Sequence, residues 1–250
     1  MSDSPDSSAS LDLVVFPDDW SSALAVVAHP DDVEYGASAA VAAWTDAGKS
    51  VAYLLVTRGE AGIDAMDPHE AAVVREAEQR AACEAVGVDV LEYLDHPDGT
   101  IEYGVALRRD IAAAVRRHQP ELVVTLTHRE QFAGGGWNMA DHIAVGRAVI
   151  DAVRDAGNRW VFTDLAADGL EAWPGVRYVA LSGSPSATHA VDVTDSIDRG
   201  VASLLAHEAY LAGLGDSSMA DADAFLRGIA EFTGQRFGGR LAASFELVEL

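Results

Sequence analysis

The sequence predicts an α/β fold in which a mostly parallel sheet carries helices on both faces. Short apolar runs alternate with longer segments of helical periodicity, which is the pattern of consecutive β-α units. A chain of 250 residues is long enough for a full hydrophobic core. No linker-like stretch and no internal repeat divides it, so we expect a single domain.

The apolar runs and the periodic segments give the expected elements in chain order. Strands are expected at residues 23–28, 51–56, 90–94, 122–126, 177–181, 190–193 and 244–249. Helices are expected at residues 37–47, 70–86, 105–118, 140–156, 197–212 and 221–232. Gly48 and Gly87 directly follow the first two helical segments, where glycine commonly ends a helix. The elements after residue 156 rest on shorter patterns.

Composition excludes several classes of function. The formal charge is -23, and Lys49 is the only lysine among 17 basic residues. Such acidity repels phosphate backbones and anionic lipid surfaces, so we expect neither nucleic-acid nor membrane binding. No apolar run approaches the roughly 20 residues that cross a bilayer. Hydrophobic residues make up 49% of the chain, which argues against disorder.

The N-terminus and the single cysteine indicate the cellular setting. Residues 1–12 are polar and acidic, lack the layout of a secretory signal and are expected to form a short disordered tail. Cys83 has no partner for an internal disulfide, and its helical context favours packing over chemistry. We therefore expect a cytoplasmic protein.

Polar residues gather at one end of the expected strands. His29, Asp31 and Asp32 follow the first strand in the stretch VVAHPDDVEYG. The residues at 57–60, 95–99 and 127–142 follow the next three strands. Because ligands bind beyond the carboxyl ends of strands in an open parallel sheet, these loops are the candidate site.

The first loop has the residue types of a metal site. His29 and Asp32 supply an imidazole and a carboxylate, which are two of the three protein ligands of a typical catalytic zinc site. His142, where a glycine-rich loop runs into a helix, is the best candidate for the third ligand. Asp31 is then free to accept a proton from a water on the metal, as a general base.

A structural explanation of the same residues competes with this one. Pro30 suits the first turn of a helix, and Asp31 and Asp32 would there cap amides and complement the helix dipole. A buried histidine satisfied by one hydrogen bond is also commoner than a metal ligand. The position after the first strand, together with the distant Asp141-His142 pair, favours the metal site.

A second His-Pro-Asp tripeptide, residues 96–98, is less promising. Asp98-Gly99 is a turn signature, no helix begins there and no second carboxylate follows. We expect a turn near the rim of the site, with Asp98 at most a substrate contact.

At these residues the sequence resembles the LmbE-like, or PIG-L, family of metal-dependent N-deacetylases. The matching pieces span residues 24–211 and are AHPDDVEYG (28–36), VTRGEAG (56–62), VREAEQRAA (74–82), ADHIAVGRAV (140–149) and DVTDSIDRGVASLLAHEAYL (192–211). The AHPDD motif followed about 110 residues later by Asp-His is fairly specific, and the other pieces are weaker individually.

The resemblance implies a Rossmann-like fold over residues 13–250 and hydrolysis of an N-acyl group from an amino sugar. It implies zinc, with ferrous iron as the alternative, held by His29, Asp32 and His142 beside Asp31 as base. Arg75 matches a substrate-binding arginine of the family; a solvated arginine on a helix is the structural alternative. The class of substrate implied is an N-acetylglucosaminyl compound or another small N-acyl amino sugar or glycoconjugate.

One departure from the family pattern concerns the second half of the site. The family commonly has His-Pro-Asp-His where this chain has Met139-Ala140-Asp141-His142. The first histidine of that motif helps to stabilise the oxyanion or to protonate the leaving amine, and methionine does neither. His128, Asn138 and His207 are the candidates to take over this role. Loss of one oxyanion donor costs on the order of 100- to 1,000-fold in rate.

Other polar residues have two interpretations each. Arg58 and Glu60 either orient a ligand or form a structural ion pair. Asp141 holds a neighbouring side chain or caps its helix. Trp137, after three glycines, either stacks on a sugar from a mobile loop or packs into the protein.

Two rival functions fit the same residues. Two histidines and a carboxylate also describe ferrous oxygenases. Met139 favours a second rival, a non-catalytic or altered-activity protein that binds a metal or a sugar. A dinucleotide-binding role is disfavoured, because no Gly-x-Gly-x-x-Gly follows the first strand. Self-association into a homo-oligomer is compatible with the sequence.

Overall fold

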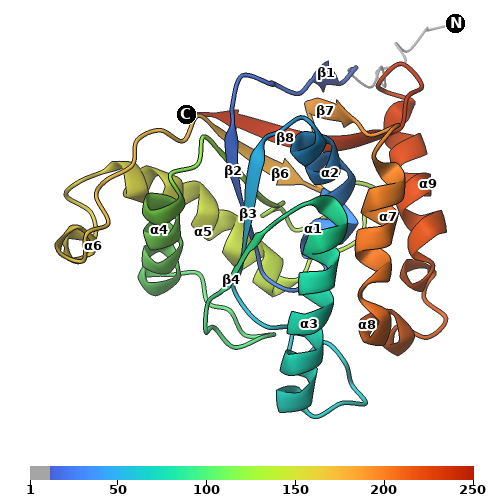
Figure 1. Cartoon of the computed structure of the whole chain (residues 1–250), viewed down its shortest axis with the longest axis horizontal. Helices are drawn as coiled ribbons and strands as arrows, with labels where there is room; N and C mark the ends of the chain where they lie inside the picture. The colour runs from blue at the N-terminus through green and yellow to red at the C-terminus, as the bar shows by residue number, and fades with distance from the viewer. Residues whose placement is uncertain (1–11) are drawn as a thin grey trace, which may run out of the picture.

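The computed structural model describes residues 12–250 and forms three layers (Figure 1). The sheet occupies the middle layer, with α4 (Val105–His118) and α5 (Ala140–Gly157) on one side. On the other side lie α2 (Ser38–Asp46), α3 (Pro68–Val86), α7 (Ile197–Leu205) and α9 (Ala222–Gly234). The acidic tail expected at residues 1–12 falls, apart from Asp12, outside the described residues.

The described residues form one sheet in the order β1-β7-β8-β6-β5-β2-β3-β4. The strands are β1 (Val14–Val15), β2 (Ser22–Val27), β3 (Ser50–Leu55), β4 (Val90–Tyr93), β5 (Leu122–Leu126), β6 (Tyr178–Ser182), β7 (His189–Asp192) and β8 (Ala242–Glu249). All neighbouring pairs are parallel except β6–β8 and β7–β8. The α/β class and the mostly parallel sheet are therefore confirmed.

Both faces of the sheet are buried. Along β2, Ala23, Ala25 and Val27 face one core cluster, whereas Leu24 and Val26 face the other. The first cluster packs under α2, α3, α7 and α9, and the second packs under α4 and α5. Because successive side chains of a strand point to opposite faces, a strand between two helical layers must be apolar at every position. This explains the continuous apolar runs of the sequence.

One expected helix is split in the structure, and another is preceded by a short helix that was not expected. The helix expected at 37–47 is α2, and α1 (Asp32–Gly36) comes directly before it, with Ala37 between the two. The segment expected as one helix at 197–212 forms α7 and α8 (Glu208–Gly213), and the break turns His207 into the interior. The short elements β1, α6 (Thr163–Ala167) and the 3₁₀ turn η1 (Ser218–Ala220) were not expected.

Two close approaches bring the loops at the carboxyl ends of the strands together. A Cβ on Gly146 of α5 would lie 2.6 Å from the Leu126 carbonyl oxygen, so only glycine lets α5 lie against the end of β5. Gly59, after β3, has φ +67, and a Cβ there would lie 3.0 Å from both Arg75 Nε and Pro30 Cδ. The loops after β2, β3 and β5 thereby converge. Across residues 12–250, none of the helices combines the length and apolar character that a bilayer crossing requires.

Candidate metal centre

The loop from β2 to α1 holds His29 and Asp32 in a fixed relation. The His29 backbone N–H donates to Asp32 Oδ2 at 2.8 Å, which folds the carboxylate back over the turn. Between them Asp31 adopts a left-handed backbone with φ 81, uncommon for a non-glycine residue. Residues in such sparsely populated conformations cluster at functional sites.

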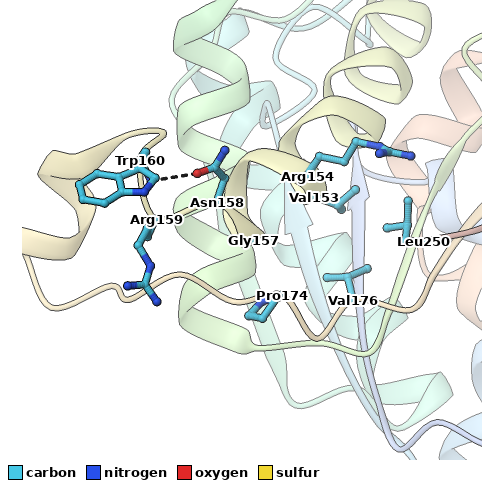
Figure 2. A pocket seen from close by; sticks show the side chains of 9 residues that line it. All are labelled: Val153, Arg154, Gly157, Asn158, Arg159, Trp160, Pro174, Val176 and Leu250. Atoms are coloured by element: carbon cyan, nitrogen blue, oxygen red, sulfur yellow. Dashed lines mark hydrogen bonds between the residues drawn. The ribbon is translucent and has the colours of Figure 1, made fainter.

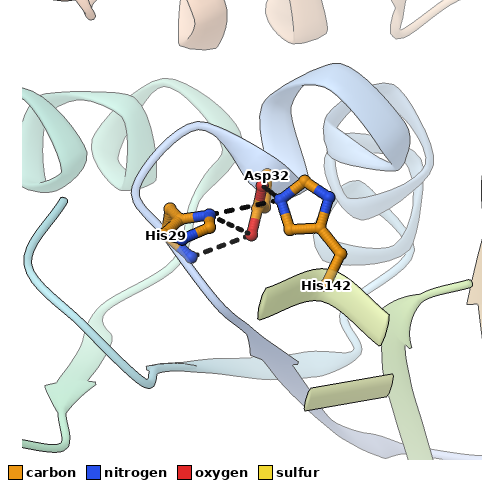
Figure 3. A group of neighbouring side chains, drawn as sticks. All are labelled: His29, Asp32 and His142. Atoms are coloured by element: carbon orange, nitrogen blue, oxygen red, sulfur yellow. Dashed lines mark hydrogen bonds and ion pairs between the residues drawn. The ribbon is translucent and has the colours of Figure 1, made fainter. Parts of the chain in front are cut away.

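His29, Asp32 and His142 converge at the carboxyl edge of the sheet (Figure 3). His142 Nε2 lies 3.0 Å from Asp32 Oδ1 and 3.2 Å from His29 Nδ1. His29 Nδ1 lies 3.6 Å from Asp32 Oδ2. All three residues are buried. The structure therefore brings these three side chains together, although His29 and His142 are 113 positions apart in the sequence.

Hydrogen bonds on the far sides of both rings fix their tautomers. Asn138 Oδ1 lies 3.0 Å from His142 Nδ1, and an amide oxygen only accepts, so this nitrogen carries the proton. His29 Nε2 faces two carboxylates, Asp98 at 3.0 Å and Asp141 at 3.2 Å, and donates to them. The lone pairs of His29 Nδ1 and His142 Nε2 therefore point towards each other and towards Asp32.

Three electron-pair donors at this spacing require a positive charge between them. Burial alone would lower the pKa of His29, but the hydrogen bonds that its ring donates to the carboxylates of Asp141 and Asp32 raise it well above its ordinary value. A divalent cation meets the same need for all three donors at once. Ligands about 2.0–2.1 Å from a tetrahedral zinc lie about 3.3 Å apart, and the three separations here are 3.0, 3.2 and 3.6 Å. The residues fit a metal ion with an open position.

Two carboxylates, those of Asp98 and Asp141, lie at Nε2 of His29 and orient its ring. Asp141 accepts from the Gly99 and Ile101 backbone N–H groups at 2.7 and 3.0 Å, as well as from His29. Asp98 accepts from the Ala61 N–H at 2.8 Å. Carboxylates that hold the outer nitrogen of a ligating histidine set its tautomer and raise its basicity. Asp98, expected at most to touch substrate, makes its contacts with protein groups, and Asp141 holds a neighbouring side chain.

Asp31 faces α3 rather than the two histidines. Its carboxylate accepts from Arg75 Nη2 at 2.6 Å, and its backbone N–H donates to Gln79 Oε1 at 3.1 Å. Burial raises the pKa of Asp31 to about 6. The positive charge of Arg75 lowers this pKa, and the negative charge of Asp32 raises it further. For Asp32, burial is outweighed by His142 and His29, which hold its pKa below the usual range. Neighbouring carboxyl groups with diverging pKa values are typical of divided acid-base roles.

Arg75 is buried, so the interpretation as a solvated surface arginine is wrong. Its Nη2 also donates to the Pro30 carbonyl oxygen at 2.5 Å, and its guanidinium lies 4.1 Å from the centre of the Tyr210 ring. Its Nε and Nη1 are buried without a hydrogen-bond partner among the described residues. Buried donors of this kind call for a water or a ligand.

Arg58 lies in a structural ion-pair network at the edge of the sheet. Its Nε donates to Glu76 at 2.5 Å, and its Nη1 donates to Asp95 at 2.8 Å and to the Leu94 carbonyl oxygen at 3.1 Å. Glu60 accepts from the Arg58 and Asp98 backbone N–H groups, which joins the two loops. The direct Arg58–Glu60 pair is replaced by these contacts.

His207 occupies an internal position behind Asp31. The ring is fully buried, with Nε2 at 3.7 Å from Glu34 and Nδ1 at 4.0 Å from Glu78. Gln79 Nε2 donates to Glu34 at 3.0 Å, and this bond connects the same buried cluster to Asp31. The structure thus gives His207 buried carboxylates as neighbours and no exposed surface.

The remaining candidates lie on the loop between β5 and α5. Asn138 donates to the Thr127 and Arg129 carbonyl oxygens at 2.8 and 2.9 Å while it holds His142. His128 is partly buried and its Nδ1 has no described partner. Met139 is 54% exposed and Trp137 is 74% exposed, so the packed interpretation of Trp137 is wrong.

Gln79 was missed from the sequence. It touches both the backbone of Asp31 and Glu34, and no motif singled it out. Its spacing from Arg75 was the available signal, because residues four apart lie on one face of a helix. A face of α3 that brings Arg75 to Asp31 necessarily brings Gln79 there as well.

The comparisons with known proteins agree with this geometry. The model of the PIG-L family, described as GlcNAc-PI de-N-acetylase, matches residues 24–153. Diacetylchitobiose deacetylase of Thermococcus kodakarensis is 28% identical over 90% of this chain and 82% of its own. The 1D-myo-inositol 2-acetamido-2-deoxy-alpha-D-glucopyranoside deacetylase of Kineococcus radiotolerans is 33% identical over 52% of this chain, which spans 44% of that relative.

A solved structure gives the same result for the fold. The N,N'-diacetylchitobiose deacetylase from Pyrococcus horikoshii superposes with a TM-score of 0.83 at 24% identity, covering 92% of this chain and 85% of that one. The family model covers more than half of the chain and includes all three converging donors. The chain therefore belongs to the PIG-L family of metal-dependent N-deacetylases.

Proposed function

We propose that the protein is a zinc-dependent hydrolase that removes an N-acetyl group from an amino sugar, with an N-acetylglucosaminyl compound as the substrate class. The observation that carries this proposal is the convergence of three electron-pair donors, His29, Asp32 and His142, beside the buried Asp31. Two imidazole nitrogens and one carboxylate are a typical donor set for catalytic zinc. Ferrous iron is the alternative metal for the same set.

A cation held there would polarise the amide carbonyl and lower the pKa of a bound water towards about 7. We assign Asp31 as the base that takes a proton from the attacking water. Arg75 fixes one of its oxygens, and Gln79 holds its backbone, so the other oxygen keeps a defined direction. With its pKa raised to about 6, Asp31 is both a competent acceptor near neutral pH and a donor afterwards.

The proton for the departing nitrogen has few sources in this chain. Met139 stands where family members have histidine and carries no proton. His207 is enclosed behind Asp31, and Asn138 is committed to His142 and two carbonyl oxygens. We therefore assign the second step to Asp31 as well, which returns the proton it has taken. One residue serving both steps accounts for activity without the family histidine.

Met139 also favours a second candidate, a protein that binds a metal and an amino sugar without turnover. This candidate shares the metal centre and differs only in the fate of the amide bond. It predicts saturable binding with no free amine released. A cytoplasmic location and a small-molecule substrate are expected for both candidates.

A free-amine assay on zinc-loaded protein across a panel of N-acyl amino sugars tests the proposal. Wild type should release amine from at least one N-acetylglucosaminyl compound, and Asp31→Asn should lose turnover by roughly 100- to 10,000-fold while keeping its zinc. Asp95→Asn is the matched control, because Asp95 lies at the same edge with a side chain 90% exposed. Unchanged turnover in Asp31→Asn, or no amine from wild type, would contradict the assignment.

A further inference from the structure

A hollow of about 520 Å³ lies beside the metal centre, at the same edge of the sheet. Its lining consists of His128, Arg129, Glu130, Gln131, Trp137 and Pro185. These residues follow β5 and β6, and the two strands are direct neighbours in the sheet. One side chain, Asn138, connects the hollow to the metal centre: it donates to the Arg129 carbonyl oxygen and holds His142 Nδ1.

Backbone hydrogen bonds give the loop that carries Trp137 a defined conformation. Gln131 and Trp137 form an antiparallel bridge, and the Phe132 N–H donates to the Gly136 carbonyl oxygen at 2.8 Å. The Ala133 N–H donates to the Gly183 carbonyl oxygen at 2.9 Å, which ties the loop to the segment after β6. The loop is thus a small hairpin. It presents the indole of Trp137 at a defined place beside the hollow.

The ring of His128 is partly buried and lines the hollow. Its Nδ1 is closed to solvent and has no partner among the described residues, so a ligand in the hollow would meet the other ring nitrogen, Nε2. Burial lowers the pKa of His128, and the charge of Arg129 lowers it further, so the ring is neutral at neutral pH. A neutral imidazole has one donor and one acceptor nitrogen, which suits a hydroxyl group.

The charges around the hollow are already compensated. Arg129 donates to Glu246 through Nε at 3.0 Å and through Nη2 at 2.6 Å, and Ser184 donates to the same carboxylate. The guanidinium is therefore engaged by a protein carboxylate, and Glu130 adds a negative charge. In a chain of net charge -23, this surface disfavours a phosphate or a carboxylate. It suits a polar but uncharged ligand.

We propose that this hollow is a subsite for a neutral sugar ring linked to the amino sugar whose N-acetyl group lies at the metal centre. A sugar ring presents an apolar face of C–H groups and an edge of hydroxyls. The indole of Trp137 packs on the apolar face, and His128 forms a hydrogen bond with a hydroxyl at the edge. Ligand sites commonly combine an aromatic surface with a few polar groups in this way. The inference rests on the proposed deacetylase function and narrows its substrate to neutral glycosides.

The protein contains a matched control for Trp137 at the other end of α5. There Trp160, 80% exposed, lines a second hollow of about 580 Å³ with Arg154, Arg159 and Leu250 (Figure 2). The side chains of the two arginines extend in different directions (Figure 2). Val153 and Gly157 of this lining lie 11 and 15 residues after His142 along α5, an axial distance of about 17–23 Å. Trp160 is thus as exposed as Trp137 but remote from the metal.

The test compares N,N'-diacetylchitobiose with N-acetylglucosamine as substrates of the zinc-loaded protein. In Trp137→Ala, the ratio of kcat/KM for the disaccharide to that for the monosaccharide should fall about tenfold, mainly through KM. Trp137→Phe should restore most of the ratio, and Trp160→Ala should leave it at the wild-type value. A ratio in Trp137→Ala equal to that in Trp160→Ala would overturn the subsite.

A binding measurement tests the subsite independently of the proposed deacetylase activity. Calorimetric titration of zinc-loaded Asp31→Asn with diacetylchitobiose should give a Kd that rises about tenfold when Trp137→Ala is added. Such binding without any turnover by wild type would support the subsite and contradict the deacetylase. N-acetylglucosamine 1-phosphate should bind no more tightly than N-acetylglucosamine. Tighter binding of the phosphate, lost in Arg129→Ala, would overturn the preference for a neutral ligand.

Discussion

The tripeptide His-Pro-Asp occurs twice at the carboxyl edge of the sheet, and the two copies present opposite ends to the metal centre. In residues 29–31, His29 faces His142, while Asp31 turns to Arg75 on α3. In residues 96–98, His96 turns away to Asp110 at 3.0 Å, and Asp98 meets His29 Nε2. One copy contributes its imidazole, and the other contributes its carboxylate.

The backbone that follows each tripeptide explains the difference. After Asp31 the chain enters α1 at once, and Asp32 folds back onto the His29 N–H. After Asp98 comes Gly99 with φ +81, and the chain turns without a helix. The same three residues therefore have different roles because the next residue begins a helix in one case and a turn in the other.

Replacing His29 and His96 one at a time should give the largest difference between the two tripeptides. His29→Ala removes a ligand, so we expect the zinc content after dialysis to fall below about a tenth of an equivalent and turnover to disappear; loss of even an outer partner costs 10- to 100-fold in affinity. His96→Ala should keep a full equivalent. Equal zinc content in the two variants, measured by elemental analysis, would contradict the assignment.

Asp98→Asn tests whether the second tripeptide serves the first. The amide oxygen accepts a weaker hydrogen bond from His29 Nε2 because it carries no negative charge, so zinc affinity should fall about 10- to 100-fold. Competition with a chelator of known affinity measures the change. Asp95→Asn, an exposed aspartate three residues earlier, is the control. An unchanged affinity in Asp98→Asn would leave Asp98 as a substrate contact only.

Gln79→Met tests the support behind Asp31. The substitution leaves the Asp31 N–H and Glu34 Oε1 without this partner, and each buried unsatisfied group costs about 1–3 kcal/mol. Because Ser203 still donates to Glu34 at 3.3 Å, we expect a net loss near 1–2 kcal/mol in chemical denaturation. The kcat should fall while zinc content stays at wild type; a lower zinc content with normal kcat would argue against this role.

The smallest effect is expected for the His96–Asp110 pair. It is partly exposed, and pairs of this kind contribute about 0.2–1 kcal/mol. His96→Gln should therefore lower the free energy of unfolding by no more than about 1 kcal/mol and leave kcat/KM unchanged. A large loss of turnover in this variant would show that the second tripeptide also uses its imidazole.

The convergence of His29, Asp32 and His142 was predictable because the carboxyl ends of parallel strands share one edge. The inward turn of Asp98 was not, since Asp-Gly signals a turn but not which side chain faces inward. The continuous periodicity through His207 hid a helix break, and the short helix α1 before Ala37 was not predicted either. Gln79 became visible only once the register of α3 against Asp31 was known. Tertiary packing, rather than local preference, decides each of these features.

Anomalous diffraction at the zinc absorption edge, from crystals of the zinc-loaded protein, tests the central claim most directly. We expect a single peak about 2.0–2.2 Å from His29 Nδ1, His142 Nε2 and an oxygen of Asp32. His29 Nε2 should remain within hydrogen-bond distance of Asp98 and Asp141. A peak bound instead by His29 Nε2, Asp98 and Asp141 would contradict the account.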